Sequence, residues 1–263
     1  VFGELVLKFL LVASYAPSLV NFRLAFIESL LAAGQKVHIA APNISDDIET
    51  TTILEDLGVV VHEIKMNRTG SNPLADILSI FSLLLLMLKI KPTYFLGYTI
   101  KPVIYGNIAA FLARVPYRFA LITGLGYAFQ NSVKPNLVKH FVSYISKTRY
   151  TLALGKCEKV IFQNPDDRDL FGELGIVKNP NRTAVVNGSG VDCNAFSVSA
   201  QPETASFLLI ARLLGDKGVR EYAQAAKIVK EKHPEATFQL VGWLDHGPDC
   251  IDQVELDGWV NDG

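Results

Sequence analysis

Short apolar runs alternate along the chain with stretches in which apolar residues recur every three or four positions. The runs are typical of buried strands, and the recurring pattern is typical of helices packed against a core. Strands are predicted at residues 8–13, 36–40, 59–64, 93–96, 117–122, 159–162, 183–186, 207–210 and 237–241. Helices are predicted between them, at residues 22–31, 48–57, 74–88, 104–113, 136–154, 168–174 and 219–232. This alternation predicts an α/β fold whose mostly parallel sheet carries helices on both faces.

A polar segment at residues 197–206 (SVSAQPETAS) interrupts the alternation and is the best linker candidate. It predicts an N-terminal domain over residues 1–196 and a second domain over residues 207–263. A parallel sheet of two or three strands cannot cover both of its faces. We therefore expect the second domain to be truncated, with its remainder lying beyond Gly263.

One segment is apolar enough to raise the question of a membrane span. Residues 77–88 (ILSIFSLLLLML) are too few to cross a bilayer, which takes about 20 apolar residues. We expect an almost fully buried helix here and no transmembrane span. The apolar run near the N-terminus contains Lys8 and follows Glu4, which favours a buried strand over a secretory signal.

The composition and charge exclude several classes of partner. The net charge is −1, which gives no electrostatic basis for binding nucleic acid. The three cysteines are widely spaced and odd in number, which indicates reduced thiols in a cytoplasmic protein. No Cys or His spacing indicates a metal site, and the Gly124-Leu125-Gly126 turn lacks the third glycine of a dinucleotide-binding motif. We expect no bound metal and no cofactor.

The stretch at residues 207–226 (FLLIARLLGDKGVREYAQAA) predicts a strand that enters a helix through a glycine-bearing turn. Such a turn gathers backbone N–H groups and the positive end of a helix dipole at one place. Arg212 and Lys217 add two positive charges five residues apart, so both can converge on one anion such as a diphosphate. A surface turn with two solvated cations is the alternative, and the spacing alone leaves both open.

Loops after the strands are the other candidate binding elements, because open parallel sheets bind ligands at the carboxyl ends of their strands. With two such sheets joined by a linker, we expect a cleft between domains. The loops that would face it are residues 14–18, 97–101, 123–129, 187–192, 212–218 and 242–248. In the NGSGVD segment at 187–192, Gly188 and Gly190 fit a ligand contact and a flexible interdomain turn equally well.

Residues 134–159 form the one locally basic stretch. Lys139, Lys147 and Arg149 stand there among aromatic residues, with hardly any acidic residue between them. A basic helix with aromatic residues can lie on an anionic membrane surface. A solvated helix face is the alternative, so peripheral membrane contact stays an open expectation.

Four motifs together resemble the family 4 glycosyltransferases of GT-B fold. They are LVASYAPSLVNFR in the first loop, PYRFALITGLGYAF at the fifth strand, NGSGVD before the linker, and LLIARLLGDKGVREYAQAA after it. Within the family, the chain looks closest to bacterial enzymes that add a sugar to a polyprenyl-diphosphate-linked saccharide during surface polysaccharide or glycan assembly. The resemblance implies two Rossmann-like parallel-sheet domains facing a cleft, with the acceptor on the first domain and the nucleotide-sugar on the second. It also implies a metal-independent reaction that retains the anomeric configuration.

The family's functional residues transfer to this chain at the matching motifs. Arg212 and Lys217 match its two cations on the donor diphosphate, and Gly242 matches the position where the nucleotide base approaches the backbone. Residues of the first domain that match or lie in the loops on the acceptor and sugar side are Ser14, Tyr15, Ser18, Thr99, Lys101, Thr123 and Gly124.

Two departures from the family pattern limit this transfer. The loop after the fourth strand lacks the family's sugar-contacting histidine, and the E-x7-E carboxylates of the donor site would lie beyond Gly263. We expect a glycosyltransferase that uses a UDP-sugar, with N-acetylhexosamines among the candidates, on a lipid-linked acceptor at the inner face of the cell membrane, and we expect residues 1–263 alone to be inactive. The alternative is a truncated, noncatalytic remnant that binds an acceptor lipid or a partner protein.

Overall fold

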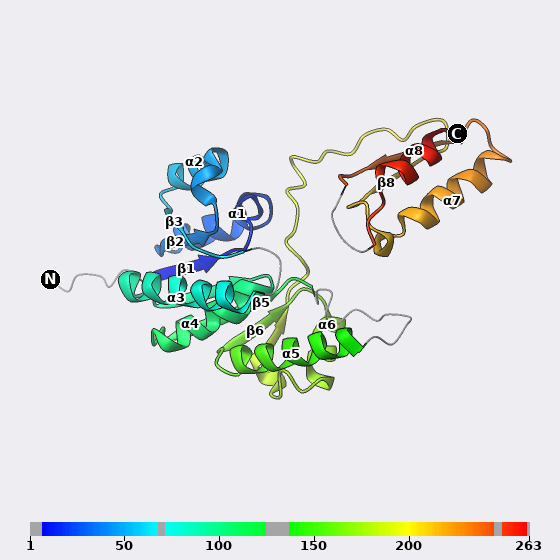
Figure 1. Ribbon diagram of the computed structural model, residues 1–263. Helices are drawn as coiled ribbons and strands as arrows, with labels where there is room; N and C mark the ends of the chain where they lie inside the picture. Colours follow the sequence, from blue (N-terminus) through cyan, green and yellow to red (C-terminus); the bar gives the residue numbers. More distant parts are fainter. Residues whose placement is uncertain (1–6, 68–71, 125–136, 245–248, 262–263) are drawn as a thin grey trace. The chain divides into compact units, whose positions relative to one another are not determined.

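The computed structural model describes residues 7–67, 72–124, 137–244 and 249–261, with residues 137–142 described by their backbone alone. The chain divides into two compact units, Val1–Val191 and Asp192–Gly263 (Figure 1). Each unit contains its own parallel sheet, so each is described by itself.

Unit 1 is built on a seven-stranded sheet in the order β3-β2-β1-β4-β5-β6-β7, in which all neighbouring strands are parallel. The predicted α/β fold is confirmed. Its strands are β1 (Lys8–Val12), β2 (Lys36–Ala41), β3 (Val60–Glu63), β4 (Tyr94–Tyr98), β5 (Tyr117–Ile122), β6 (Lys159–Phe162) and β7 (Thr183–Val185). Its α-helices are α1 (Pro17–Ala32), α2 (Ile48–Asp56), α3 (Pro73–Ile90), α4 (Asn107–Leu112), α5 (Leu137–Leu154) and α6 (Pro165–Glu173). Shorter turns are η1 (Ile44–Asp46), η2 (Pro102–Gly106, a π-helical turn that leads directly into α4) and η4 (Pro180–Arg182).

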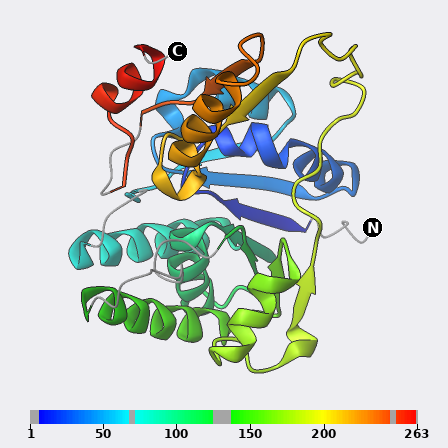
Figure 2. The ribbon, with the colours of Figure 1, turned by 90° about the vertical axis from the view of Figure 1, so that its right-hand side faces the viewer.

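The helices cover both faces of this sheet, because successive strand residues point to opposite sides. Alternate residues of β1 divide accordingly: Leu10 and Val12 enter one core cluster, and Phe9 and Leu11 enter the other. Helices α1 and α2 cover the second cluster, and α3, α4 and α5 cover the first (Figures 1 and 2). Because the sheet is buried on both faces, its strands appear in the sequence as continuous apolar runs.

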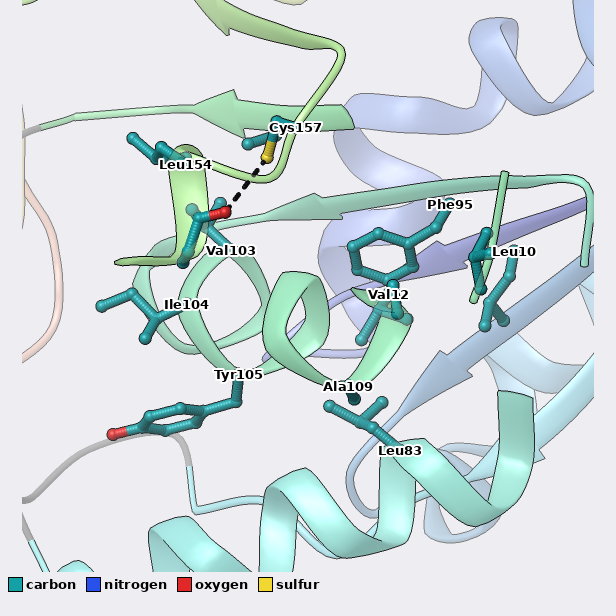
Figure 3. Packing of buried hydrophobic residues seen from close by; sticks show 14 of the residues in the cluster. Leu10, Val12, Leu83, Phe95, Val103, Ile104, Tyr105, Ala109, Leu154 and Cys157 are labelled. Carbon is teal, nitrogen blue, oxygen red and sulfur yellow. Dashed lines mark hydrogen bonds between the residues drawn. The ribbon is translucent and has the colours of Figure 1, made fainter. Parts of the chain in front are cut away.

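The core beneath α3 and α4 is closely packed, and one glycine is required for it. Figure 3 shows Leu10, Val12 and Phe95 from the strands meeting Leu83 of α3 and Ala109 of α4. A Cβ at Gly106 would lie 2.5 Å from the Phe95 ring, so a larger residue at the end of η2 would displace that ring.

The prediction that residues 77–88 form an almost fully buried helix is wrong. Helix α3 buries Asp76, Ser79, Leu83, Met87 and Ile90. Its opposite side exposes large apolar side chains, each 50–73% accessible: Leu74, Ile77, Leu78, Phe81, Leu85 and Leu88. By length and composition, this is the one helix among the described residues that could cross a membrane. Because α3 is apolar all round, its hydrophobic pattern does not distinguish the inner side from the outer one.

Unit 2 contains the parallel pair β8 (Ser206–Ile210) and β9 (Thr237–Val241), with helices α7 (Val219–Lys230) and α8 (Gln253–Asn261). The turn η5 (Gly215–Lys217) joins β8 to α7. A small core forms around Leu213, Val219 and Ile251. The Arg220 guanidinium binds Glu255 at 2.6 and 2.9 Å and Asp249 at 3.0 Å, which ties α7 to the chain leading into α8.

Candidate functional site

The order of strands in unit 1 indicates where a ligand crevice lies on this sheet. Strands β1, β2 and β3 run outward in one direction, whereas β4 lies on the other side of β1. A sheet whose order reverses in this way opens a crevice at the carboxyl ends of the two central strands. The loops after β1 and β4 meet there, and the Ser14 Oγ lies 2.8 Å from the Thr99 Oγ1. Two predicted site residues, 85 positions apart, are thus brought into contact.

The backbone beside this contact is constrained. Thr99 has a φ of 67°, in the left-handed region that a β-branched residue rarely adopts. Two residues earlier, a Cβ at Gly97 would lie 2.5 Å from the Pro102 carbonyl oxygen, so β4 and η2 approach too closely for any side chain there. Conformations of this kind cost about 1–3 kcal/mol and cluster at ligand sites. The loop after β4 is therefore held in one position by its surroundings.

Ser18, another predicted site residue, takes part in a partly buried series of hydrogen bonds. Its hydroxyl donates to the Tyr15 carbonyl at 2.5 Å and lies 2.8 Å from the Tyr98 hydroxyl. Since the single Ser18 proton is already used, the Tyr98 hydroxyl is the donor of the second bond. Burial raises the pKa of Tyr98 to about 12, against the opposing effect of the Arg23 charge. Tyr98 therefore stays neutral and able to donate at physiological pH.

Arg23 connects the Tyr98 side chain to Ser189 of the NGSG segment. Nothing in the sequence marks Arg23 as a candidate site residue. It is only 7% exposed, lies 4.9 Å from the centroid of the Tyr98 ring, and donates at 2.7 Å to the Ser189 hydroxyl. Burial lowers the pKa of Arg23. On α1 it stands beside the exposed Phe22, so its position in the sequence gives no sign that it points inward. A buried arginine stacked on an aromatic ring holds the loop that carries Gly188 and Gly190 against α1.

An open groove of about 870 Å³ lies at the carboxyl ends of β1, β2 and β3. It is lined by Ser14, Tyr15, Ala16, Pro17, Pro42, Asn43, Asp46, Asp47, Met66 and Asn67. The lining combines backbone, hydroxyl, amide and carboxylate groups around a few apolar atoms, which suits a polar organic ligand such as a saccharide. The predicted residues Ser14 and Tyr15 therefore face a real cavity.

Lys101 and Arg149, predicted for two different roles, converge on one buried carboxylate. The Lys101 Nζ lies 3.2 Å from the Asp76 Oδ1, and an Arg149 guanidinium nitrogen lies 3.6 Å from the Asp76 Oδ2. Burial, followed by hydrogen bonding to Asp76 and the charge of Asp76, raises the pKa of Tyr105 well above its ordinary value. This cluster joins α3, the loop after β4, η2 and α5. The role of Lys101 toward an acceptor stays a prediction, since its ammonium group already has an ionic partner.

The remaining candidates of unit 1 lie at strand ends. Thr123 and Gly124 directly follow β5, and Gly124 has a φ of 149°, where a side chain is disfavoured. Gly188 and Gly190 have φ values of 72° and 74°, and a Cβ at either would meet no other atom within 4 Å. These glycines serve backbone conformation rather than close packing. The part of the predicted fifth loop after Gly124 lies outside the described residues.

In unit 2, the predicted cations flank the link between β8 and α7. Arg212 and Lys217 are both exposed, and the Lys217 Nζ lies 3.8 Å from the Asp216 Oδ2. Gly218, at a φ of 74°, is the N-cap residue of α7, so the turn ends at a helix N-terminus as predicted. After β9, a Cβ at Gly242 would lie 2.0 Å from the Ala211 carbonyl oxygen, so only glycine fits there. The two loops that would hold a nucleotide diphosphate and its base therefore lie against each other.

Helix α5 (Leu137–Leu154) covers most of the basic stretch, as predicted, and its cations differ in surroundings. Lys147 is exposed, whereas Arg149 is directed toward Asp76. For Lys139 the helical backbone alone is described. Within the described ranges, no group of three or more His, Cys, Asp or Glu residues could hold a metal ion.

Comparison with known proteins identifies relatives of both units. Residues 8–164, which span the sheet of unit 1 as far as β6, match the family described as glycosyl transferase 4-like. A protein of Campylobacter jejuni, N,N'-diacetylbacillosaminyl-diphospho-undecaprenol alpha-1,3-N-acetylgalactosaminyltransferase, is 28% identical over 248 residues. The alignment covers 89% of this chain and 62% of that protein, so the chain spans less than two thirds of its relative's length.

Solved structures agree on the fold. Sucrose-phosphate synthase from Thermosynechococcus elongatus superposes with a TM-score of 0.66 at 13% identity, covering 97% of this chain and 67% of that structure. HepE of Anabaena, solved in complex with UDP and glucose, superposes with a TM-score of 0.62 at 17% identity, covering 97% of this chain and 65% of that structure. At these identities the similarity is one of fold.

Proposed function

The chain belongs to the glycosyl transferase 4-like family, and from that premise we propose that the protein transfers a sugar from a UDP-sugar to a lipid-linked saccharide. Family membership confirms the resemblance carried by the sequence motifs. The observation that carries the proposal is the alignment with the Campylobacter protein, because it extends over both units. The name of that relative specifies N-acetylgalactosaminyl transfer to a sugar on diphospho-undecaprenol. An N-acetylhexosamine is accordingly the first donor sugar to test. The transfer would serve surface polysaccharide or glycan assembly.

The donor half of the reaction is assigned to unit 2. Arg212 and Lys217 carry positive charge beside the N-terminus of α7, which is the arrangement that binds a diphosphate. As the bond between the anomeric carbon and the diphosphate oxygen breaks, UDP leaves with the bonding electron pair. The two cations stabilise the negative charge that develops on this leaving group. Such a pair supplies the electrostatic role that a divalent metal plays in other transferases, so we propose a metal-independent reaction.

The acceptor half is assigned to the crevice of unit 1. The groove at the ends of β1, β2 and β3 offers polar partners to a saccharide, and the Ser14–Thr99 contact forms its border with β4. An acceptor hydroxyl there forms the new glycosidic bond to the anomeric carbon, and its proton passes to the departing diphosphate of UDP. Following the family resemblance, we propose that the anomeric configuration of the sugar is retained.

A donor screen tests the proposal. The full-length protein is incubated with separate UDP-sugars and a polyprenyl-diphosphate-linked saccharide, and the mass of the lipid product is measured by mass spectrometry. We expect one UDP-sugar to add a single sugar residue, with a UDP-N-acetylhexosamine the leading candidate. Absence of any extended product across the panel, in a folded protein, would favour a noncatalytic lipid-binding or partner-binding role instead.

A further inference from the structure

The outer side of α3 is an apolar surface that unit 1 does not cover. The residues Leu74, Leu78, Phe81, Leu85 and Leu88 follow one another at intervals of three or four, so they form one continuous stripe along the helix. Each is 50–73% exposed. A stripe of this length on the outside of a folded unit marks an interaction surface rather than scattered surface residues.

The opposite side of α3 excludes the simplest interpretation, a transmembrane span. Leu83, Met87 and Ile90 are buried in the core against strand residues such as Phe95. Asp76, in the first turn, is buried and ion-paired with Lys101 and Arg149. A helix anchored in this way along its inner side can lie in a membrane interface, with its outer stripe among the acyl chains.

The charge around the stripe identifies its partner. In the sequences of α3, η2, α4 and α5, Asp76 is the one acidic residue, and it is buried and paired. Exposed cations lie at the end of the stripe, at Lys89 and Lys91, and on α5 at Lys147. The two helices are joined by the contact between Asp76 and Arg149. An apolar stripe that ends in two exposed cations, on a helix whose one acid is buried and paired, complements an anionic lipid surface. It opposes a second copy of the same face, because like charges would then meet.

We propose that the stripe Leu74–Leu88 of α3, with the exposed Lys89 and Lys91 at its end, seats the protein on an anionic lipid bilayer. This inference rests on the proposed function for its purpose, since a lipid-linked acceptor stays in the membrane. The N-terminal end of α3 lies next to the loop after β4 through the Asp76–Lys101 ion pair. Seating α3 therefore brings the lipid surface to the edge of the sheet that carries the acceptor groove.

Co-sedimentation with vesicles of phosphatidylglycerol and phosphatidylcholine tests the surface. The variant Phe81→Glu/Leu85→Glu places two charges in the stripe. The matched control Phe22→Glu/Ile48→Glu makes the same changes on exposed positions of α1 and α2, over the opposite face of the sheet. We expect the partition coefficient of the stripe variant to fall by at least about tenfold and that of the control by less than about twofold. Circular dichroism verifies that both variants are folded.

Three results would overturn the inference. They are equal binding by the two variants, no vesicle binding by the unmodified protein, and a dimer in sedimentation velocity that the stripe variant alone dissociates. A transfer assay separates this inference from the proposed function. The stripe variant should keep transfer to a short-chain, water-soluble acceptor and lose it toward an acceptor embedded in vesicles. If vesicle binding depends on α3 but neither acceptor is extended, the proposed function fails and the lipid surface stands.

Discussion

Lys217 provides the sharpest test of the donor site, through its replacement by alanine. The Lys217 side chain is 42% exposed, and its Nζ lies 3.8 Å from the Oδ2 of Asp216, whose side chain is 40% exposed. Such a surface pair contributes about 0–1 kcal/mol. A charge-assisted hydrogen bond from the ammonium to a diphosphate contributes about 1.5–3 kcal/mol. UDP binding exchanges the first interaction for the second, so Lys217→Ala should weaken UDP binding by about 0.5–3 kcal/mol, or about 2- to 160-fold in Kd.

Isothermal titration calorimetry at fixed ionic strength measures this loss. The control is Lys232→Ala, which removes another exposed lysine of unit 2 after the end of α7 and changes the net charge equally. The difference between the variants should shrink as salt is added, because screening weakens the lost interaction. Equal UDP affinities in the two variants would refute the assignment of Lys217 to the diphosphate.

Three further substitutions test the glycine packing described above and the protonation of His38, which is 7% exposed and whose Nδ1 lies 2.9 Å from the His62 Nε2. The pKa of His38 is lowered to about 4, first by burial and then by the charges of His62 and two lysines, so the folded protein takes up its proton less readily than the unfolded chain. The free energy of unfolding should therefore fall as the pH drops below 6.5, by about 2 kcal/mol between pH 7 and 5 from this group. In His38→Gln, the free energy of unfolding measured in urea should depend less on pH, by the same amount. Parallel pH profiles for the variant and the unmodified protein would contradict this expectation. Gly97→Ala should lower the free energy of unfolding by about 1–3 kcal/mol, because its Cβ would overlap the Pro102 carbonyl. The control Gly172→Ala should not destabilise the protein, because a Cβ there meets nothing within 4 Å. Gly242→Ala should both lower the melting temperature of unit 2 and weaken UDP binding. An unchanged melting curve would show that the ends of the two strands can separate to admit the methyl group.

Much of the architecture could be predicted from hydrophobic patterning. Each parallel strand is buried on both faces and therefore appears as a short apolar run, and glycines end several of the helices between them. The strand, turn and helix that carry Arg212 and Lys217 were also recognisable, because they are contiguous in the sequence, whereas their binding of a diphosphate is still a prediction. The structure places Ser14 and Tyr15 at a groove, although their contact with an acceptor is still a prediction.

Features that depend on distant contacts were not predictable in the same way. The carboxylate of Asp76 pairs with Lys101 and Arg149, which lie 25 and 73 positions further along the chain, and no local spacing signals that meeting. Arg23 sits on a helix whose neighbouring residue is exposed, so its burial under the NGSG segment follows from tertiary packing alone. The exposed side of α3 was missed because apolar residues surround the whole helix, which removes the polar face that normally marks solvent.

In the proposed reaction, sugar leaves UDP only to join a lipid-linked saccharide. Released UDP and extended lipid-linked product can be measured in the same reaction of the full-length protein, with and without acceptor. We expect equal amounts of UDP and product when acceptor is present, and little of either without it. UDP release that does not depend on the acceptor, or a complete lack of product with every UDP-sugar, would contradict it.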